Sequence, residues 1–255
     1  MVKLSNEEKI KLYEDVSPIA AEFRRSFITD DDVIEDTFQK IQQLGFLLIR
    51  FPATGKNSGL SGFTIHKEPY DCIYINSNHS LGRQYLSCWH ECFHIITKEG
   101  NGLSYVKAIK EDPIEYKANI FASMILMPEN LVKKYVEEKS ISIEYISHID
   151  IIKMQNYFKV SYSAMLTRLM QIYPQYKKAL SNRYAIAIKS EYQREKLIRK
   201  TKEASGDIKL ISPSNDIYIP DSFYEDLAFN IQEKRISKNK AFEILKIIDG
   251  LNNGL

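Results

Sequence analysis

The chain has 255 residues, of which 44% are hydrophobic and 27% charged, and its formal net charge is +2. This length and composition suit one large or two modest folded domains and exclude extended disorder. No apolar run approaches the roughly 18 residues that a membrane-spanning helix needs, and the charged N-terminus lacks the apolar stretch of a secretory signal. The three cysteines have no framework spacing, so we expect a cytoplasmic protein without a membrane partner.

The small net charge hides an uneven distribution. Residues 177–202 carry nine basic and two acidic side chains, a net +7, whereas residues 1–137 carry 16 basic and 19 acidic side chains, a net −3. A local excess of this kind can bind nucleic acid or an acidic partner. An exposed helix face gives the same pattern, so both interpretations stay open and nucleic acid is at most a secondary partner.

The first half of the chain predicts a small sheet that leads into a helix. Asp30–Asp32 precede apolar residues at helical spacing, which predicts a capped helix ending at Gly45. Three runs rich in β-branched and aromatic residues predict strands: 46–51, 59–65 and 72–76. The last of these would present an edge for an extended substrate segment. In Leu81–Ile96 apolar residues recur at the spacing of an amphipathic helix.

The second half of the chain predicts mostly helices. One begins at Asp112-Pro113 and stops at Met127-Pro128. Residues 146–172 predict two helices joined by a short break, a pair that is similar to a helix-turn-helix, although any αα-hairpin gives the same signal. The C-terminal part adds further helices, the last of them capped by Ser237 and ending at Gly250.

The most specific chemistry lies in the run His90-Glu91-Cys92-Phe93-His94, which matches H-E-x-x-H. Positions i and i+4 of a helix share one face, so the two imidazoles can hold one Zn²⁺ ion. Glu91 would then act as the general base on the water at the metal. A catalytic zinc takes three protein ligands and leaves a fourth position open, so the motif lacks one ligand.

Glu115 is the best candidate for the third ligand. It lies 21 residues after His94 on the next predicted helix, where Glu115 and Asn119 flank the apolar stripe. The competing interpretation is a capping box, in which Glu115 hydrogen-bonds to the backbone amide of Asp112. Asn119 would either orient a ligand imidazole or lie on an exposed helix face. The spacing leaves both pairs of alternatives open.

These motifs and elements together predict an α+β fold. A small mixed or antiparallel sheet is expected to pack on a zincin-like helix that carries H-E-x-x-H and on the helix that follows it. We expect a zincin-like metallopeptidase domain over 1–137, a helix-turn-helix-like helical pair over 138–180, and a mostly helical C-terminal region without an assigned role over 181–255.

Three stretches resemble the ImmA/IrrE metallo-endopeptidases of bacteria and their mobile elements. Residues 74–76 and 89–94 are similar to a strand of that family and to the metal-binding helix that follows it. Residues 115–128 are similar to its E-x-x-A-N-x-F-A helix and L-L-M-P ending. Residues 158–169 are similar to its F-x-V-S…A…R-L helical pair. The resemblance covers about residues 40–172.

The resemblance implies that His90, His94 and Glu115 bind one zinc ion and that Glu91 is the catalytic base. It also implies a protein substrate, a helix-turn-helix transcriptional repressor that is cut to release genes of a stress response or a mobile element. Family members often read H-E-L-G-H, whereas this chain has Cys92-Phe93 in the middle. We therefore expect altered packing against the next helix and an altered pocket shape.

The leading hypothesis is a cytoplasmic zinc-dependent endopeptidase that acts on a transcriptional repressor. The alternative is a non-enzymatic regulator that binds DNA or protein and carries a structural or vestigial zinc site. Salt-sensitive binding to duplex DNA would favour this alternative. The sequence names neither the oligomeric state nor the residue that stabilises the transition state.

Overall fold

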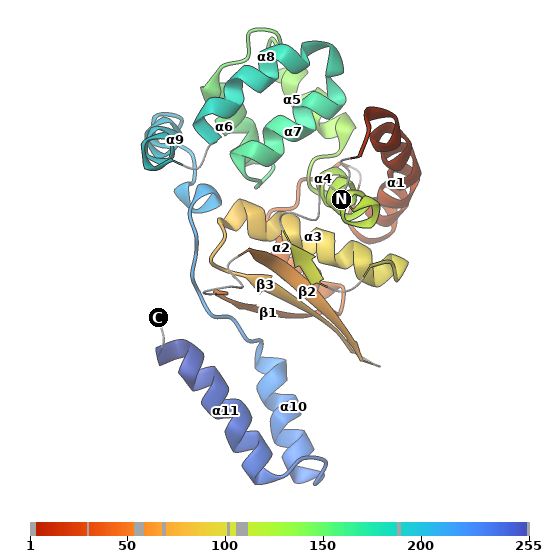
Figure 1. The fold of residues 1–255 in the computed structure, drawn as a ribbon, viewed down its shortest axis with the longest axis vertical. Coiled ribbons are helices and arrows are strands. Elements are labelled where there is room, and N and C mark those ends of the chain that lie inside the picture. Colours follow the sequence, from red (N-terminus) through yellow and green to blue (C-terminus); the bar gives the residue numbers. More distant parts are fainter. Residues whose placement is uncertain are drawn as a thin grey trace.

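The computed structural model describes residues 4–29, 31–53, 59–67, 70–100, 103–105, 112–187 and 190–253. It confirms an α+β fold with a small mixed sheet (Figure 1). The strands are β1 (Leu47–Phe51), β2 (Leu60–Lys67), β3 (Tyr70–Asn76) and β4 (Leu103–Tyr105). The helices are α1 (Asn6–Phe27), α2 (Thr37–Gln43), α3 (Leu81–Thr97), α4 (Pro113–Leu126), α5 (Glu129–Glu138), α6 (His148–Tyr157), α7 (Tyr162–Ile172), α8 (Lys177–Ser181), α9 (Glu191–Glu203), α10 (Asp221–Gln232) and α11 (Lys238–Asn253).

The sheet has the strand order β1-β3-β2-β4, with β1 and β3 parallel and the other pairs antiparallel. Ile73 and Ile75 of β3 are fully buried. Tyr74 between them points to the opposite face, where its ring stacks on Phe63 and contacts Phe51. Because β3 is paired on both sides, the expectation that it presents a free edge to substrate is wrong.

An aromatic core fixes α3 between the sheet and the helices α1 and α4. Trp89 and Phe93 of α3 are fully buried. Phe23 of α1 meets Trp89 edge-on with ring centroids 6.0 Å apart, and Phe121 of α4 lies 5.5 Å from Phe93. Phe93 replaces the glycine of the family pattern, and its ring packs on α4, the helix that follows. The sheet and these helices thereby hold the H-E-x-x-H helix rigidly.

The helical pair α6–α7 packs directly on the start of α3. A Cβ atom on Gly82 would come within 2.5 Å of the backbone of Val160 and Ser161, in the turn between the two helices. Arg168 of α7 is buried and donates a hydrogen bond of 2.8 Å to the carbonyl of Met127. The one basic side chain of α7 therefore holds the pair to the end of α4.

We expect Gly82→Ala to lower the free energy of unfolding by about 1–3 kcal/mol, because the added methyl group meets backbone atoms that cannot rotate aside. Gly250→Ala is the matched control. Gly250 lies inside α11, and among the described residues nothing comes within 4 Å of a Cβ placed there. This control should be neutral or stabilise by up to about 1 kcal/mol. Urea denaturation measures both, and equal stabilities would contradict the close packing at Gly82.

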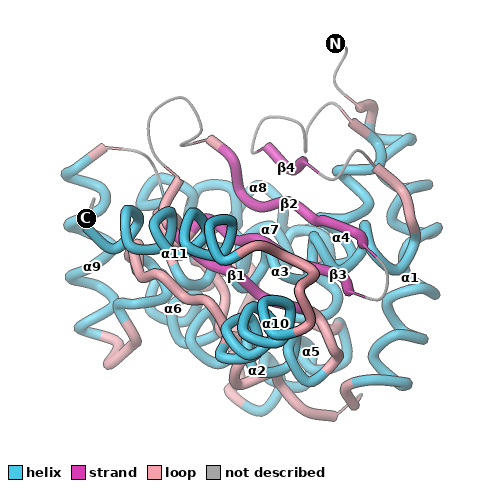
Figure 2. Tube along the Cα trace, turned by 90° about the horizontal axis from the view of Figure 1, so that it is seen from below, coloured by secondary structure: helices cyan, strands magenta, loops and turns pink. Residues whose placement is uncertain are grey.

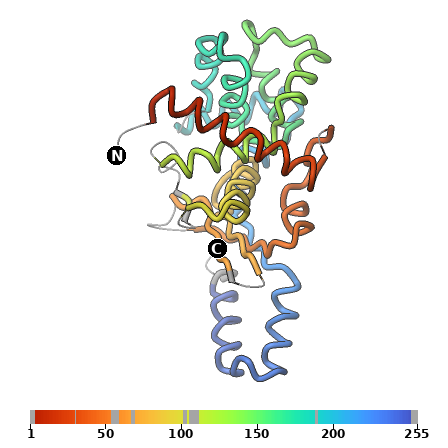
Figure 3. Tube along the Cα trace, turned by 90° about the vertical axis from the view of Figure 1, so that its right-hand side faces the viewer, coloured from red at the N-terminus to blue at the C-terminus, as the bar shows by residue number. Residues whose placement is uncertain are grey.

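The C-terminal part returns to the sheet before it forms a hairpin. Arg50 of β1 and Tyr218 exchange two backbone hydrogen bonds of 2.9 and 2.7 Å, and Asp216 forms an ion pair of 2.8 Å with the Arg50 guanidinium. Helices α10 and α11 then extend from the side of the sheet opposite α3 (Figures 1 and 3). Seen from below, this hairpin lies in front of the sheet (Figure 2).

The predicted start of α2 is wrong by four residues. The helix begins at Thr37 rather than Val33, because Asp36 accepts hydrogen bonds from the first free amides at 2.9 and 3.1 Å. Asp30 lies outside the described residues. The domain boundaries at 137/138 and 180/181 stay predictions. Within the part of the chain that is described, no helix is long and apolar enough to cross a membrane.

Candidate metal centre

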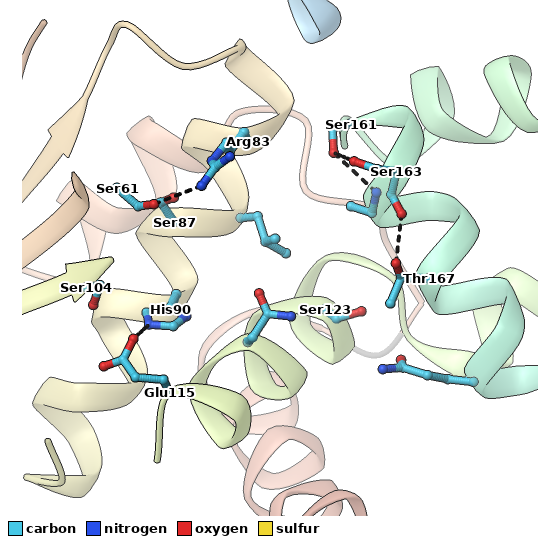
Figure 4. Close-up of a pocket in the computed structure, with 14 residues that line it drawn as sticks. Ser61, Arg83, Ser87, His90, Ser104, Glu115, Ser123, Ser161, Ser163 and Thr167 are labelled. Atoms are coloured by element: carbon cyan, nitrogen blue, oxygen red, sulfur yellow. Dashed lines mark hydrogen bonds and ion pairs between the residues drawn. The ribbon is translucent and has the colours of Figure 1, made fainter. Parts of the chain in front are cut away.

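Helices α3 and α4 bring three potential ligands together, two of which, His90 and Glu115, are drawn in Figure 4. The Nε2 atom of His90 lies 3.1 Å from a carboxylate oxygen of Glu115 and 3.2 Å from Nε2 of His94. The Nε2 atom of His94 lies 3.4 Å from the other carboxylate oxygen. All three side chains are buried. Among the described residues they are the one group of this kind whose ligand atoms all lie within 4.8 Å of one another.

This group has the chemistry and the spacing of a zinc site. Bonds of 2.0–2.1 Å in a tetrahedron place neighbouring ligand atoms about 3.3–3.4 Å apart. The two imidazole nitrogens lie 3.2 Å apart, and each lies 3.1 or 3.4 Å from a different carboxylate oxygen of Glu115. Two imidazole nitrogens and one carboxylate also match the three protein ligands of a catalytic zinc, which leave one corner open. The residues therefore fit a single metal ion.

The geometry of α4 argues against the capping-box interpretation of Glu115. Asp112 caps α4 with its own carboxylate, which accepts a hydrogen bond of 2.8 Å from the Ile114 amide. Glu115 makes no capping-box bond and faces the two imidazoles. Burial acts to raise the pKa of Glu115, but its hydrogen bonds with His90 and His94 outweigh burial and lower the pKa to about 2. The carboxylate is therefore ionised at neutral pH.

A backbone carbonyl orients the second imidazole. Nδ1 of His94 donates a hydrogen bond of 2.7 Å to the carbonyl of Glu99. Because a carbonyl only accepts, the neutral ring carries its lone pair on Nε2, the atom that faces Glu115. Gly100 lies so close that a Cβ atom there would be 2.7 Å from Nδ1. Neither contact has a sequence signal beyond the glycine after the helix, and the sequence analysis missed both.

Glu91 is fully buried beside the imidazoles. Among the described residues, neither of its carboxylate oxygens has a hydrogen-bond partner of normal geometry. Burial raises the pKa of Glu91 to about 8, while the His94 charge and the Ser104 hydroxyl act in the opposite direction. Gly62 of β2 lies against it, since a Cβ atom there would be 2.9 Å from Oε1. A buried carboxylate without a partner is an unusual feature that points to an ion, a water or a catalytic role.

Two thiols and one amide near the motif lie outside the donor set. Cys88 and Cys92 are fully buried in the core, and burial raises the pKa of both thiols. Asn119 lines the cleft described below, and the structure shows no hydrogen bond between it and His90 or His94. The alternative in which Asn119 orients a ligand imidazole therefore has no support in the geometry.

A cleft of about 320 Å³ opens beside the group of ligands. Helix α3 and the start of β2 form one wall, α4 forms the floor, and the polar face of α7 forms the other wall (Figure 4). His90 and Glu115 lie at one end of this cleft. The residues that line this wall are Ser161, the N-cap of α7, and Ser163, Ala164, Thr167 and Gln171 of the helix itself. The second helix of the pair thus faces the site, which the sequence did not predict.

We expect zinc affinity to fall on acidification, because protons compete for the imidazoles. In the metal-free protein, burial acts to lower the pKa of His94, but its bonds to Glu115 and Glu99 raise it, whereas burial lowers the pKa of His90. Glu115 keeps its charge down to about pH 2. As the pH falls through the raised pKa of His94, the affinity should fall about tenfold per pH unit.

Competition with a chromophoric chelator across the range from pH 8 to pH 5 measures this dependence. The exposed His66 of β2 supplies the control, and His66→Ala should give the same curve as the unmodified chain. An affinity for zinc that stays constant over this range would show that the imidazoles do not bind the ion.

A family model described as the IrrE N-terminal-like domain, a peptidase family, matches residues 41–170, just over half of the chain. The match runs from α2 to α7 and includes His90, Glu91, His94 and Glu115. A search among curated proteins finds no match. The chain therefore belongs to the metallopeptidase family that carries the IrrE N-terminal-like domain.

Proposed function

We propose that this protein is a zinc-dependent endopeptidase that cleaves a helix-turn-helix transcriptional repressor and so relieves repression. The observation that carries the proposal is the buried group of His90, His94 and Glu115 at the end of a cleft, with Glu91 beside it. Membership of the family supports peptidase chemistry. The substrate class rests on the resemblance to the ImmA/IrrE endopeptidases.

His90, His94 and Glu115 would hold one zinc ion. Bound there, zinc would supply a Lewis acid that polarises a peptide carbonyl and lowers the pKa of water. The charge of Glu115 offsets part of the cation charge, and the Glu99 carbonyl keeps the His94 ring in the ligating tautomer. These residues thus fix the position at which the scissile carbonyl binds.

Glu91 is the group that moves the proton. With a pKa of about 8, it is protonated at neutral pH in the metal-free protein. A divalent cation next to it would lower this pKa and leave the carboxylate ionised. The ionised carboxylate accepts a proton from the attacking water and then donates it to the leaving nitrogen.

Co-expression of the chain with the repressor encoded nearest to its gene tests the proposal. Mass mapping of the repressor should reveal two fragments produced by cleavage at one peptide bond. In cells that express Glu91→Gln instead, the repressor should stay intact. An intact repressor, together with no cleavage by the purified zinc-loaded protein, would contradict the proposed substrate.

The geometry of α7 does not favour DNA reading by this helix. Its one basic side chain, Arg168, is buried, and Ser163 and Thr167 face the cleft. A helix that reads a DNA groove presents basic and polar side chains outward. A gel-shift series on duplex DNA over a range of salt concentrations distinguishes the two functions, and binding that weakens steeply with salt would favour the alternative.

A further inference from the structure

The cleft extends well beyond the metal ligands. Arg83, Ser87 and His90 occupy positions i, i+4 and i+7 of α3, which share one helix face, and all three line the cleft (Figure 4). A separation of seven residues along a helix corresponds to about 10 Å. Arg83 therefore lies two turns away from His90 on the same wall.

A β-bulge supports the Arg83 side chain. The register of β2 against β4 shifts by one residue between Leu60 and Gly62, so Ser61 is the extra residue of the bulge. The Ser61 hydroxyl accepts a hydrogen bond of 3.1 Å from a guanidinium nitrogen of Arg83. Bulges re-aim side chains, and this one directs a hydroxyl at the cleft wall, where it holds the guanidinium in place.

The guanidinium of Arg83 forms no ion pair with a carboxylate of the described residues. Among the described residues that line the cleft it is the one Lys or Arg side chain. Among the described residues Ser61 is its one hydrogen-bond partner, so most of its five N–H donors make no bond to the described part of the chain. Burial lowers the pKa of Arg83, which indicates a partly desolvated cation. Such a cation attracts an anion more strongly than one in bulk water.

We propose that this end of the cleft is a subsite for an acidic side chain of the substrate and that Arg83 binds its carboxylate. The inference rests on the proposed peptidase function. An extended peptide advances about 3.3 Å per residue, so the Asp or Glu lies about three residues from the scissile bond. Ser163 and Ala164 on the facing wall are small and leave room for the peptide.

A peptide library tests the subsite. The zinc-loaded protein digests the library, and mass spectrometry reads the cleavage sites, which should be enriched in Asp and Glu about two to four residues from the cut, on one side. Matched peptides with Glu or Gln at that position then give a ratio of kcat/KM values. Arg83→Gln should lower this ratio about tenfold or more, and Arg83→Lys should lower it less.

Arg199→Gln is the control, since Arg199 lies exposed on α9 and pairs with Glu203. It should keep the ratio of the unmodified chain. The ratio compares two peptides on one variant, so a smaller folded fraction does not affect it. Cleavage without an acidic preference, or an equal ratio in Arg83→Gln, would overturn the subsite and leave the peptidase function standing. Failure of the zinc-loaded protein to cleave any peptide would overturn both.

Discussion

Glu91→Gln is expected to keep zinc bound and to lower kcat by about 10²–10⁴-fold, the usual contribution of a general acid-base group. The amide has the shape of the carboxylate but cannot accept a proton at neutral pH. Glu91 is fully buried and makes no hydrogen bond of normal geometry among the described residues, so the substitution removes no bond that supports the fold. Folding and metal content should therefore survive.

Steady-state cleavage of a mapped repressor fragment at saturating concentration gives kcat, and elemental analysis gives the zinc content. Glu129→Gln is the matched control, because Glu129 lies on the surface of α5, where it pairs with Lys133. This control should be as active as the unmodified chain. If Glu91→Gln were equally active, another group would have to carry the proton.

Glu115→Ala is expected to lose both zinc and activity. Removing a residue that hydrogen-bonds to a metal ligand lowers the metal affinity about 10–100-fold. Removing a direct ligand should lower it more. The carboxylate lies 3.1 and 3.4 Å from the two imidazole nitrogens, so its removal leaves only His90 and His94 to hold the ion. Titration with zinc against a chelator measures the affinity, with Glu129→Ala as the control.

The two variants separate ligand from base. Glu91→Gln should be inactive with full zinc content, whereas Glu115→Ala should be inactive because it has no zinc. Glu115→Ala could instead bind zinc as tightly as the unmodified chain. The contact of Glu115 with the two imidazoles would then be only an ion pair.

Local patterns predicted the elements that carry the site. The apolar repeat in α3 and the Asp112-Pro113 start of α4 depend only on neighbouring residues, and both helices were predicted within one residue at each end. The two histidines share a helix face by geometry alone. Their meeting with Glu115 depends on how α3 and α4 pack, so spacing left that contact open.

Helix α1 was missed although it has a local signal. Ser5 and Glu8 form a capping box, in which each side chain accepts a hydrogen bond from the backbone amide of the other. The end of α11 was also wrong. Ser237 caps this helix as predicted, but the helix continues through Gly250, since a single glycine costs only about 1 kcal/mol inside a helix.

Contacts between distant segments had no sequence signal. Arg50 and Tyr218 pair across 168 positions, and Gly82 meets the turn at Val160 only because α6 and α7 fold onto α3. The same packing turns the polar face of α7 toward the cleft. The spacing of apolar residues and the capping residues describe one helix or strand at a time. They cannot predict which helix lines the cleft.

X-ray absorption at the zinc edge of the purified protein tests the metal centre most directly. We expect one zinc per chain with nitrogen and oxygen neighbours at about 2.0–2.1 Å and no sulfur. A sulfur neighbour at about 2.3 Å would place the ion at a cysteine, and a protein that binds no zinc at all would leave the buried His90, His94 and Glu115 without the role given to them.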